Sequence, residues 1–359
     1  MSIWRGNSLS MEIYGESHAT AVGVKLTGIP PLRLDVTALQ AFLERRRAVN
    51  PTISTPRNEP DRVVFLNGYK QGVLSESVVA EIANTNVKRS DYEELYGKPR
   101  PSHADYVAYA KYGTLDFSGG GRFSGRLTAP FCIAGGIAKQ ALAAEGISVL
   151  SYVQSVGTVS GRSYRDGAVS LAEIRAAQTA AFPSLSASEA MTEEIACARA
   201  DGDSVGGVAE CIAYGVPIGL GGDYAEGLEG ELARLLYAIP AVKGVEFGDG
   251  FALTAMRGSV ANDPLCYRDG TVVTETNRSG GINGGIANGM PVTVRVAFRP
   301  TPSVSVEQRT VDLVKKRNTR ISIKGRHDAC IVPRALPVVE SAVSLVLWDY
   351  LLSRRISLS

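Results

Sequence analysis

Residues 23–30 read GVKLTGIP, and residues 207–217 repeat that pattern in altered form as GVAECIAYGVP. Each copy is followed by an acidic residue that can cap a helix, Asp35 or Asp223, then by an apolar helical pattern and a strand that ends in a glycine turn. A strand–helix–strand unit with one apolar face has to bury that face against another layer. The repeat therefore predicts two sheets packed around shared helices, with chance similarity as the alternative.

The spacing of apolar residues predicts the individual elements. Apolar and polar residues alternate in residues 20–29 and 291–298, as is typical of half-buried strands, and residues 62–66 are expected to form a second strand after the first of these. Asn67-Gly68 is typical of a turn after residues 62–66. Three segments have helical patterns: residues 36–47, 130–145 and 334–354. The second of these helices is rich in Ala and Gly and should pack closely in the interior, and the third should be mostly buried.

Length and composition favour a folded protein of one large domain or two smaller ones. The chain has 359 residues, of which 45% are hydrophobic and 21% are charged. No linker divides the chain cleanly, so we expect a single domain over residues 1–359. The 38 basic and 36 acidic residues leave a net charge of +2, which argues against nucleic acid as the main partner.

The sequence shows no segment that would direct the chain to a membrane or out of the cell. No uninterrupted apolar run reaches the roughly 18 residues of a membrane helix, and the first residues lack the apolar core of a secretory signal. The five cysteines are widely spaced and form no C-x-x-C pair, which is typical of reduced thiols. We therefore expect a cytoplasmic protein that does not contact a membrane.

The histidines are the candidates for proton transfer, because histidine titrates near neutral pH. Each of the three lies within two residues of a carboxylate: His18 near Glu16, His103 near Asp105 and His327 near Asp328. No two histidines fall within one helical turn and H-E-x-x-H is absent, so we expect no metal site. A structural role is the alternative for any one of these histidines considered alone.

Arginines beside glycines indicate a binding site for anions. Residues 119–126 read GGGRFSGR, and residues 280–285 form a second glycine-rich loop. Glycine lets backbone N–H groups approach phosphate oxygens, and arginine adds bidentate bonds. Arginines at 45–47 end the first helix, where cations also complement the helix dipole, and residues 315–326 (KKRNTRISIKGR) alone would suit nucleic acid or an exposed loop. In a nearly neutral chain, these features favour a small ligand with several negative charges.

Motifs along nearly the whole chain resemble, in order, those of the chorismate synthase family. They are GESHA (15–19), RRR (45–47), EPD (59–61), SDY (90–92), RPSHADY (100–106), KYG (111–113), GGGR (119–122), DGDSVG (201–206), AVKGVEFGDGF (241–251), SGGINGGI (279–286), RPTPS (299–303) and GRHDACIVPRA (325–335). Any one of these motifs is a weak signal, whereas a dozen in family order is specific.

The resemblance implies an α+β fold, a β-α-β sandwich in which two antiparallel sheets enclose a helical layer, with an internal pseudo-repeat. It implies a carbon–oxygen lyase that converts 5-enolpyruvylshikimate 3-phosphate to chorismate by anti 1,4-elimination of phosphate. This is the last common step of aromatic amino acid biosynthesis in the shikimate pathway, and it requires reduced FMN. The length suits the single-function form, so the implied partners are an external flavin reductant, with NADP as the associated nucleotide, and further copies of the chain in a homotetramer.

The functional residues of the family map onto matching positions of this chain. By resemblance, His18 beside Ser17 would protonate the departing phosphate, His103 would donate a proton to the reduced flavin, and Asp328 would take the proton from flavin N5. His327 is expected to neighbour the site without acting as a catalyst. Candidate substrate contacts are Arg46, Arg126 and Arg326. The implied flavin contacts are Arg122, Phe123, Ser124, Pro240, Ala241, Gly284, Arg299, Pro300, Thr301, Pro302, Ser303 and Arg326.

The chain departs from the family pattern at a few positions. Ala19, Thr52 and Ser102 replace residues usual in the family, and three residues near Arg126 replace a more polar run: Phe123, Gly125 and Leu127. Phe123 has no side-chain hydrogen-bond donor. These changes leave the three proposed catalytic positions and the arginines intact, so they bear on flavin contacts and rate.

Two other functions are compatible with individual motifs. A flavin-dependent oxidoreductase that uses the same pocket would consume NAD(P)H in the presence of substrate without releasing phosphate. A non-catalytic phosphate or RNA binder that uses residues 315–326 would show steeply salt-dependent binding and would not respond to loss of His18.

Overall fold

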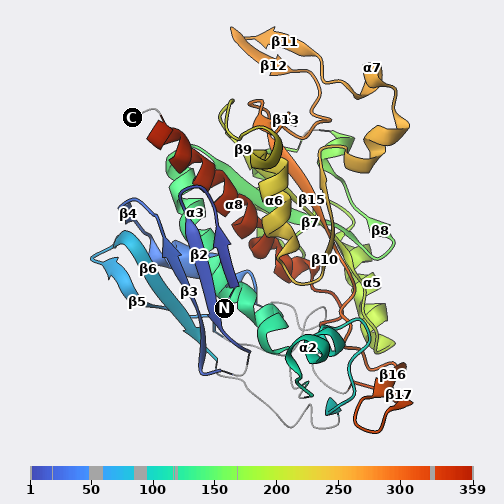
Figure 1. Ribbon diagram of the computed structural model, residues 1–359. Coiled ribbons are helices and arrows are strands. Elements are labelled where there is room, and N and C mark those ends of the chain that lie inside the picture. The colour runs from blue at the N-terminus through green and yellow to red at the C-terminus, as the bar shows by residue number, and fades with distance from the viewer. Residues whose placement is uncertain are drawn as a thin grey trace.

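Two antiparallel sheets enclose a layer of helices in this protein (Figure 1). The computed structural model describes residues 2–17, 19–47, 60–84, 95–115, 117, 120–167, 169–323 and 328–357. The β-α-β sandwich expected from the sequence is confirmed, because every strand pair in both sheets is antiparallel and the two longest helices lie between the sheets.

The first sheet comes from the N-terminal part of the chain and has the strand order β1-β2-β3-β6-β4, with β5 also paired to β6. On β3 the apolar residues Val22, Val24 and Leu26 are fully buried, which confirms the alternation expected around residues 20–29. The strands are β1 (Ser2–Arg5), β2 (Ser10–Gly15), β3 (Ala21–Thr27), β4 (Leu32–Arg33), β5 (Val63–Lys70) and β6 (Val73–Ala83).

The second sheet has the strand order β10-β15-β9-β7-β8. Val292, Val294, Val296 and Phe298 of β15 are buried, as the sequence pattern predicts. The strands are β7 (Ser148–Val156), β8 (Val159–Ser160), β9 (Gly207–Tyr214), β10 (Val242–Phe247) and β15 (Val292–Phe298).

The central layer is built on two long helices, α3 and α8, that pack against each other. Helix α3 contacts β3 and β6 of the first sheet, whereas α8 contacts β7 and β9 of the second. Helices α1 and α6 extend this layer, and α4 and α5 cover the outer face of the second sheet, which adds a layer that the sequence did not predict. The helices are α1 (Val36–Glu44), α2 (Asp105–Tyr112), α3 (Thr128–Ala144), α4 (Leu171–Thr179), α5 (Ser188–Ala200), α6 (Leu228–Tyr237), α7 (Gly258–Ala261) and α8 (Val332–Ser357).

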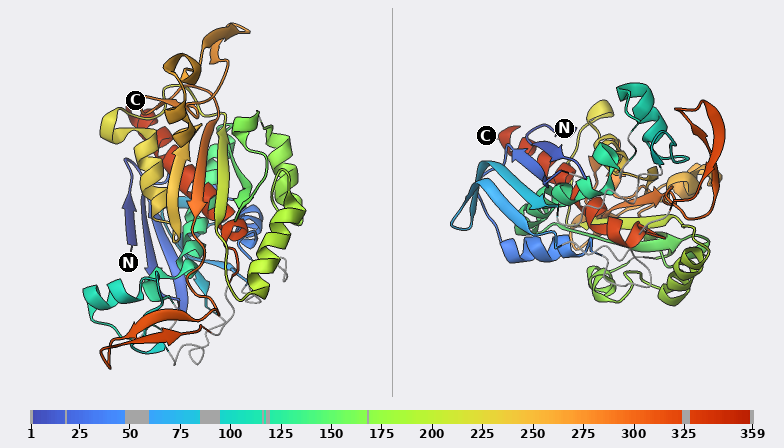
Figure 2. Two further views of the ribbon diagram at one scale, coloured as in Figure 1. Left: turned by 90° about the vertical axis from the view of Figure 1, so that its right-hand side faces the viewer. Right: turned by 90° about the horizontal axis from the view of Figure 1, so that it is seen from below.

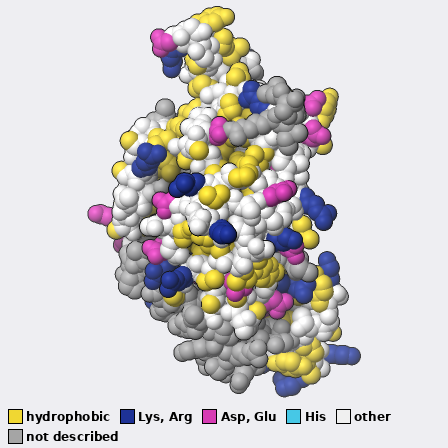
Figure 3. Space-filling model, turned by 90° about the vertical axis from the view of Figure 1, so that its left-hand side faces the viewer, with side chains coloured by type: hydrophobic (Ala, Val, Ile, Leu, Met, Phe, Trp, Pro, Cys, Tyr) yellow, Lys and Arg dark blue, Asp and Glu magenta, His cyan; other side chains and the backbone are white. Residues whose placement is uncertain are grey.

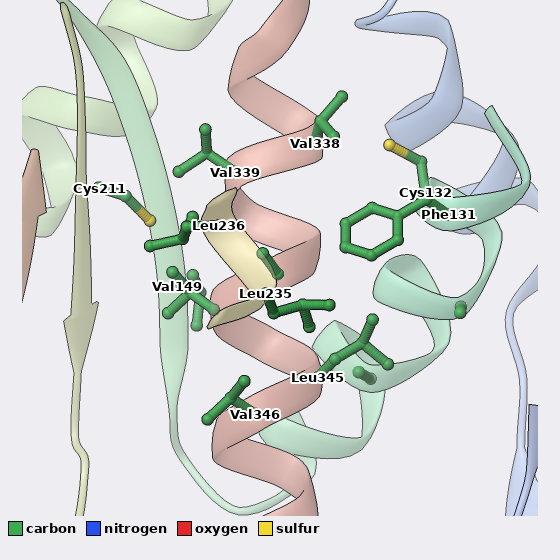
Figure 4. Close-up of a cluster of buried hydrophobic side chains, with 14 of the residues drawn as sticks. Phe131, Cys132, Val149, Cys211, Leu235, Leu236, Val338, Val339, Leu345 and Val346 are labelled. Atoms are coloured by element: carbon green, nitrogen blue, oxygen red, sulfur yellow. The ribbon is translucent and has the colours of Figure 1, made fainter. Parts of the chain in front are cut away.

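The contact between α3 and α8 depends on small side chains. A Cβ atom on Gly135 would lie 2.1 Å from the side chain of Ser341, and one on Gly136 would lie 2.4 Å from Leu39 of α1. Figure 4 shows how α8 fills the space between α3 and the second sheet, with Phe131 on one side and Val149 on the other. Burying each such side chain contributes about 1.5–3 kcal/mol, so close helix packing stabilises both halves of the sandwich.

Two segments are long and apolar enough to cross a membrane by length and composition, residues 125–144 and 332–354. Within the fold, 67% and 94% of their most apolar windows are buried, as in core helices of globular proteins. Neither segment is an uninterrupted apolar run of that length, and both qualify on average composition alone.

The internal repeat is visible in the connectivity. The first copy runs β3, α1, β5 and the second runs β9, α6, β10. In each sheet the two repeat strands flank one further strand, β6 in the first sheet and β15 in the second. Asp35 caps α1 by accepting a hydrogen bond from the Ala38 amide, but Asp223 caps no α-helix, because α6 starts later, after Gly227.

Two local expectations were wrong. Asn67-Gly68 does not end a strand: β5 continues to Lys70, and Gly68, with φ +77°, lies in an irregular part of the β5–β6 pairing, while the turn falls at Gln71-Gly72. Helix α1 ends at Glu44, so the arginines at 45–47 follow the helix instead of forming its last turn. Their side chains can therefore point in different directions.

Three two-stranded hairpins complete the fold, and two of them project at opposite ends (Figures 1 and 2). The hairpin β11–β12 belongs to an arm at the end that also carries α7, whereas β16–β17 lies beside α2. The strands are β11 (Leu265–Arg268), β12 (Thr271–Thr274), β13 (Ile282–Asn283), β14 (Ile286–Ala287), β16 (Gln308–Asp312) and β17 (Arg317–Ile321).

Candidate active site

A cavity of about 700 Å³ opens where the two halves of the sandwich meet. Its walls are drawn from distant parts of the chain, from some of the residues within 46–47, 100–104, 120–128, 237–243, 298–303 and 328–338, together with Asp61. The start of α3, the end of α6 and the start of α8 converge there. Ends of helices and strands leave backbone and polar side chains accessible, so this is a natural place for a ligand.

Positive charge dominates the cavity. Among the described residues, two of the lining residues are acidic, Asp61 and Asp328. Eight are basic: Arg46, Arg47, Arg100, Arg122, Arg126, Lys243, Arg299 and Arg334. The described lining thus has six more basic than acidic side chains, which favours a ligand with several negative charges.

His103 is held by a carboxylate, as its sequence neighbourhood suggested. Its Nδ1 lies 2.5 Å from Oδ1 of Asp105, at the start of α2. Arg100 also binds Asp105, through Nε and Nη2 at 2.8 Å each and through its backbone amide at 2.9 Å. Burial opposes ionisation of Asp105, but the hydrogen bonds from Arg100 and His103 outweigh it and lower the pKa of Asp105 to about 2.

The state of Asp105 decides the tautomer of His103. An ionised carboxylate only accepts hydrogen bonds, so Nδ1 of His103 carries the hydrogen and donates it. The remaining ring nitrogen, Nε2, is then left to exchange protons with a group in the cavity that His103 lines. The pair can therefore store and release a proton.

Arg46 and Arg126 share one counter-ion. Asp61 is buried and binds Nη1 of Arg46 at 2.5 Å with one oxygen and Nη1 of Arg126 with the other. Arg46 also donates to Oγ1 of Thr128 at 2.9 Å, and Arg126 donates to Oδ1 of Asn84 at 2.8 Å. One carboxylate thus fixes two guanidinium groups in the wall but neutralises only half of their charge.

Arg46 retains capacity for a ligand. Its Nε is buried and has no hydrogen-bond partner among the described residues. Burial lowers the pKa of Arg46, and the neighbouring Arg334 and Arg126 act in the same direction. Because an arginine side chain stays charged in proteins, the crowding raises the affinity of this corner for an anion.

Asp328 lies just before α8. Its Oδ2 accepts a hydrogen bond from Nη1 of Arg334, and Nε of Arg334 donates to the carbonyl of Arg46 at 2.8 Å. Arg334 therefore connects the carboxylate to the segment that carries Arg46. The sequence prediction placed Asp328 at the site, and it does line the cavity.

Most of the expected flavin contacts also meet in the cavity. Its lining includes Arg122, Phe123, Ser124, Pro240, Ala241, Arg299, Thr301, Pro302 and Ser303. Arg299 donates to the carbonyl of Ser102 at 2.6 Å, and Ser303 accepts from Arg100 at 3.4 Å, so this group touches the His103 segment.

Some predicted residues are placed elsewhere or lie outside the described residues. Gly284 is in the β13–β14 turn, which lies towards the end of the molecule that carries β11–β12 and away from α2 (Figure 1). Pro300 and Ser17 are not among the lining residues, although Ser17 is buried and its hydroxyl has no partner among the described residues. Positions outside the described residues are His18, Thr52, Arg326 and His327.

The segment around position 18 is nevertheless tied to the cavity wall. Nδ2 of Asn84 donates to the carbonyls of Glu16 and Ala19, at 3.2 and 2.8 Å. The same Asn84 accepts the hydrogen bond from Arg126, and Arg122 lies 4.0 Å from the Glu16 carboxylate. The residues on either side of position 18 are thus held beside two cavity arginines.

Sequence reasoning did not single out several residues that the cavity uses. Asp61, Arg100 and Arg334 organise the charged groups, and Arg47 and Lys243 add charge to the lining. The signal was present, because each of these residues stands inside one of the family motifs, such as EPD or RPSHADY. What was lacking was the knowledge of which side chains point inward.

Comparison with known proteins agrees with these observations. The family model described as chorismate synthase matches residues 9–352. The chain belongs to the chorismate synthase family. Chorismate synthases of Thermococcus kodakarensis and Pyrococcus abyssi are 48% and 47% identical to it, each over 98% of both chains. That of Aeropyrum pernix is 46% identical over 98% of this chain and 93% of its own.

A solved crystal structure of a chorismate synthase is similar in fold. It superposes with a TM-score of 0.76 at 27% sequence identity, and the match covers 98% of this chain and 93% of the other. The resemblance inferred from a dozen short motifs is therefore confirmed. As a member of the chorismate synthase family, the protein is a lyase of the shikimate pathway, which leads to the aromatic amino acids.

Proposed function

We propose that this chain converts 5-enolpyruvylshikimate 3-phosphate to chorismate in the cationic cavity, by anti 1,4-elimination of phosphate with reduced FMN bound beside the substrate. The observation that carries the proposal is the excess of six positive charges next to the His103–Asp105 pair. The substrate has two carboxylates and a phosphate, and FMN has a further phosphate. A cavity with this charge and a proton-exchanging group matches both molecules.

The lining residues fit a phosphorylated flavin. The volume, about 700 Å³, suits a cofactor and a substrate together, since ligand pockets span roughly 300–1,000 Å³. Phe123, Pro240 and Ala241 offer an apolar wall for a flat ring, while Arg122 and Arg299 offer charge for a phosphate. When bound, reduced FMN supplies the electron density that makes loss of the weakly acidic ring proton feasible.

We assign the flavin site to the predicted residues that line the cavity, namely residues 122–124, 240–241, 299 and 301–303. Gly284, Pro300 and Arg326 are proposed on the family resemblance alone. For this glycine to reach the cavity, either a partner copy would have to supply its own Gly284 or the chain would have to rearrange locally.

Charge stabilisation is the proposed role of the arginines. Arg46 and Arg126 are fixed by Asp61, so their positive ends are oriented before the substrate arrives and need no reorganisation during the reaction. The unpartnered Nε of Arg46 is the group that we expect to donate to a carboxylate or phosphate oxygen. Neutralising the leaving phosphate in this way lowers the barrier to its departure.

Proton transfer is the proposed role of the acid–base groups. His103 would exchange a proton at Nε2 while Asp105 holds the ring in place through Nδ1. Asp328, kept in place by Arg334, would accept a proton at its carboxylate. His18, beside Ser17, would protonate the departing phosphate, and the attachment of Glu16 and Ala19 to the cavity wall through Asn84 supports that assignment.

The decisive experiment mixes the protein, chemically reduced FMN and the substrate without oxygen, and measures phosphate and chorismate. We expect both products in equal amounts and no consumption of NAD(P)H by the chain itself. Substrate-dependent NAD(P)H consumption without phosphate release would instead indicate an oxidoreductase. Absence of flavin binding and of phosphate release would overturn the proposal.

Assembly, reductant and location complete the proposed function. We propose a homotetramer in the cytoplasm that receives reduced flavin from an external reductant linked to NADP, on the strength of the family resemblance. Light scattering after gel filtration tests the tetramer, with a monomer mass as the contrary result. Addition of a flavin reductase and NADPH in place of chemical reductant tests the source of electrons.

A further inference from the structure

The hairpin β16–β17 carries a concentration of positive charge outside the cavity. Residues 307–321, which we name the basic hairpin, contain two acidic residues, Glu307 and Asp312, of which Asp312 is buried. They also contain five basic residues whose side chains are all exposed: Arg309, Lys315, Lys316, Arg317 and Arg320. Figure 3, which looks at the side of the molecule opposite to this hairpin, shows basic and acidic side chains interspersed over the described residues.

The basic hairpin starts at the rim of the cavity. It is inserted between lining residues 299–303 and lining residue Asp328, and at its base Ile323 donates to the carbonyl of Val304. Along its length Thr310 donates to the carbonyl of Pro99 at 2.5 Å and Leu313 donates to that of Gly97 at 2.8 Å. Residues 97–99 lead directly into Arg100 and His103 of the cavity wall, so hairpin and wall form one continuous surface.

Folding does not account for these charges. Arg309 and Arg320 are direct cross-strand neighbours, and like charges in that position are destabilising by up to about 1 kcal/mol. Glu307 pairs with Arg320 at 2.6 Å, but both side chains are more than half exposed, and Arg309 has no such partner among the described residues. Lys316 has φ +50°, a backbone region where glycine or asparagine is favoured. The sequence keeps positive charge here at the expense of stability.

The charges of the whole chain are distributed unevenly. The cavity lining has eight basic and two acidic side chains, and the basic hairpin has five and two, so the two regions together carry nine excess positive charges. The full chain carries only two, which leaves the remainder with an excess of seven negative charges. This uneven distribution favours attraction of anions to the cavity and the basic hairpin.

We propose that the basic hairpin is an electrostatic guide that captures small phosphate-bearing anions from solution and raises the rate at which they enter the cavity. The identity of these anions, FMN and the phosphorylated substrate, rests on the proposed function. Each strand has five residues and so spans roughly 17 Å, which is more than the Debye length of about 10 Å at 0.1 M salt, so the hairpin adds positive charge over a wider area than the cavity lining alone. Such fields raise association rates by roughly 10- to 1,000-fold at low salt.

The test compares two double variants with equal changes in charge. Arg309→Glu with Lys315→Glu reverses two charges on the basic hairpin, and Arg309→Glu also removes the like-charge pair, so the fold should be retained. Arg257→Glu with Arg268→Glu reverses two exposed charges on the arm at the other end of the molecule. Stopped-flow fluorescence then measures the association and dissociation rates of FMN at about 20 mM and about 500 mM salt.

We expect the hairpin variant to slow FMN association roughly 5- to 10-fold at low salt, with an unchanged dissociation rate and less than a twofold difference at high salt. The arm variant should behave as the wild type. Riboflavin, which has the same ring without the phosphate, should associate at the same rate with all three proteins.

Several results would overturn the proposal. Equal slowing in both variants would mean that net charge alone matters, and an altered dissociation rate would mean that the hairpin contacts bound FMN. Unchanged FMN association together with lost binding of an RNA oligonucleotide would make the hairpin a nucleic-acid surface. If the wild type binds no FMN at all, the proposed function fails first, which distinguishes the two failures.

Discussion

Two adjacent arginines, Arg45 and Arg46, follow the end of α1 and enter two different clusters of charge. Arg45 points into the helical layer and binds the fully buried Glu340 of α8 through Nη1 at 2.9 Å and Nη2 at 2.7 Å. Arg46 points into the cavity, where Asp61 satisfies only part of its side chain. The same residue type therefore serves structure at one position and binding at the next.

The cluster around Glu340 is closed, in the sense that the protein itself supplies all the hydrogen-bond donors that its carboxylate needs. Besides Arg45, its carboxylate accepts hydrogen bonds from Lys139, from the amide and hydroxyl of Ser151, and from Gln178. These donors belong to α3, β7 and α4, so one carboxylate joins elements on both sides of α8. Burial opposes ionisation of Glu340, but Arg45 and Lys139 outweigh it and lower its pKa to about 2. The bonding capacity of this carboxylate is taken up by the protein itself.

The cavity cluster is open. Its positive charges exceed its negative ones, an N–H of Arg46 is unpaired among the described residues, and His103 has one ring nitrogen free of Asp105. The contrast teaches that unmet bonding capacity distinguishes a binding site from a structural ion cluster better than charge or burial does. Four variants test this distinction.

The largest effect is expected at the acid–base pair. His103→Ala should lower turnover by roughly 10²- to 10⁴-fold, because it removes the group that exchanges a proton in the cavity. The free energy of unfolding should change little, since the ring is part of an open site. Anaerobic turnover assays and urea unfolding check both expectations. Near-normal turnover would remove His103 from the mechanism.

The next effect concerns stability and pH. A carboxyl group whose pKa is lower in the folded state stabilises the fold above its unfolded pKa, near 4.5, and the contribution disappears as the pH falls towards 2. Glu340→Gln should therefore lose about 3 kcal/mol of unfolding free energy at pH 7 and should show a flatter decline than the wild type between about pH 5 and 2. Urea unfolding at several pH values measures this. Parallel pH profiles would show that Glu340 is not ionised in the fold.

Arg46→Ala should affect binding more than folding. We expect kcat/KM to fall about 100-fold, the usual scale for removing one partner of a desolvated charge contact, because substrate loses a fixed guanidinium. Stability should change by less than about 1 kcal/mol, since Asp61 keeps Arg126 as its partner and the crowding of cations is relieved. A large loss of stability with unchanged kcat/KM would show that Arg46, like Arg45, serves the fold and not ligand binding.

The smallest effect is expected for Arg45→Lys. Lysine keeps the charge but cannot form the bidentate bond to Glu340, so the unfolding free energy should fall by about 1 kcal/mol. Turnover and KM should be unchanged, because Arg45 does not line the cavity. A raised KM would show that the two clusters are coupled through the end of α1.

Much of the fold could be predicted from local patterns. The alternation on β3 and β15 and the apolar length of α8 depend only on the repeat distances of strands and helices, and both are confirmed. The sequence signal for a turn was less reliable. Asn67-Gly68 lies at an irregularity within β5, because β6 continues to pair with β5 beyond Gly68. A local preference for a turn is weak compared with several cross-strand hydrogen bonds.

Part of the site could be predicted as well. The sequence places His103 two residues from Asp105, and the structure shows that their side chains are in contact, because that separation at the start of a helix allows it. The sequence could not predict that Arg45 would bind Glu340 in the helical layer while Arg46 lines the cavity. The directions of side chains that follow a helix end are not set by the helix pattern. The placement of Gly284 away from the cavity was also not foreseeable from its motif.

By itself, the order of residues determined the family, through motifs that lie in family order, and with it the two-sheet architecture. It also predicts a ligand with several negative charges. These inferences use residue identity and order, which are local or additive along the chain. Tertiary structure alone decided that Asp61, Arg334 and Glu340 hold the charges in place and that one cluster is closed while the other is open. Charges interact through space at a few ångströms, and only the folded chain sets those distances.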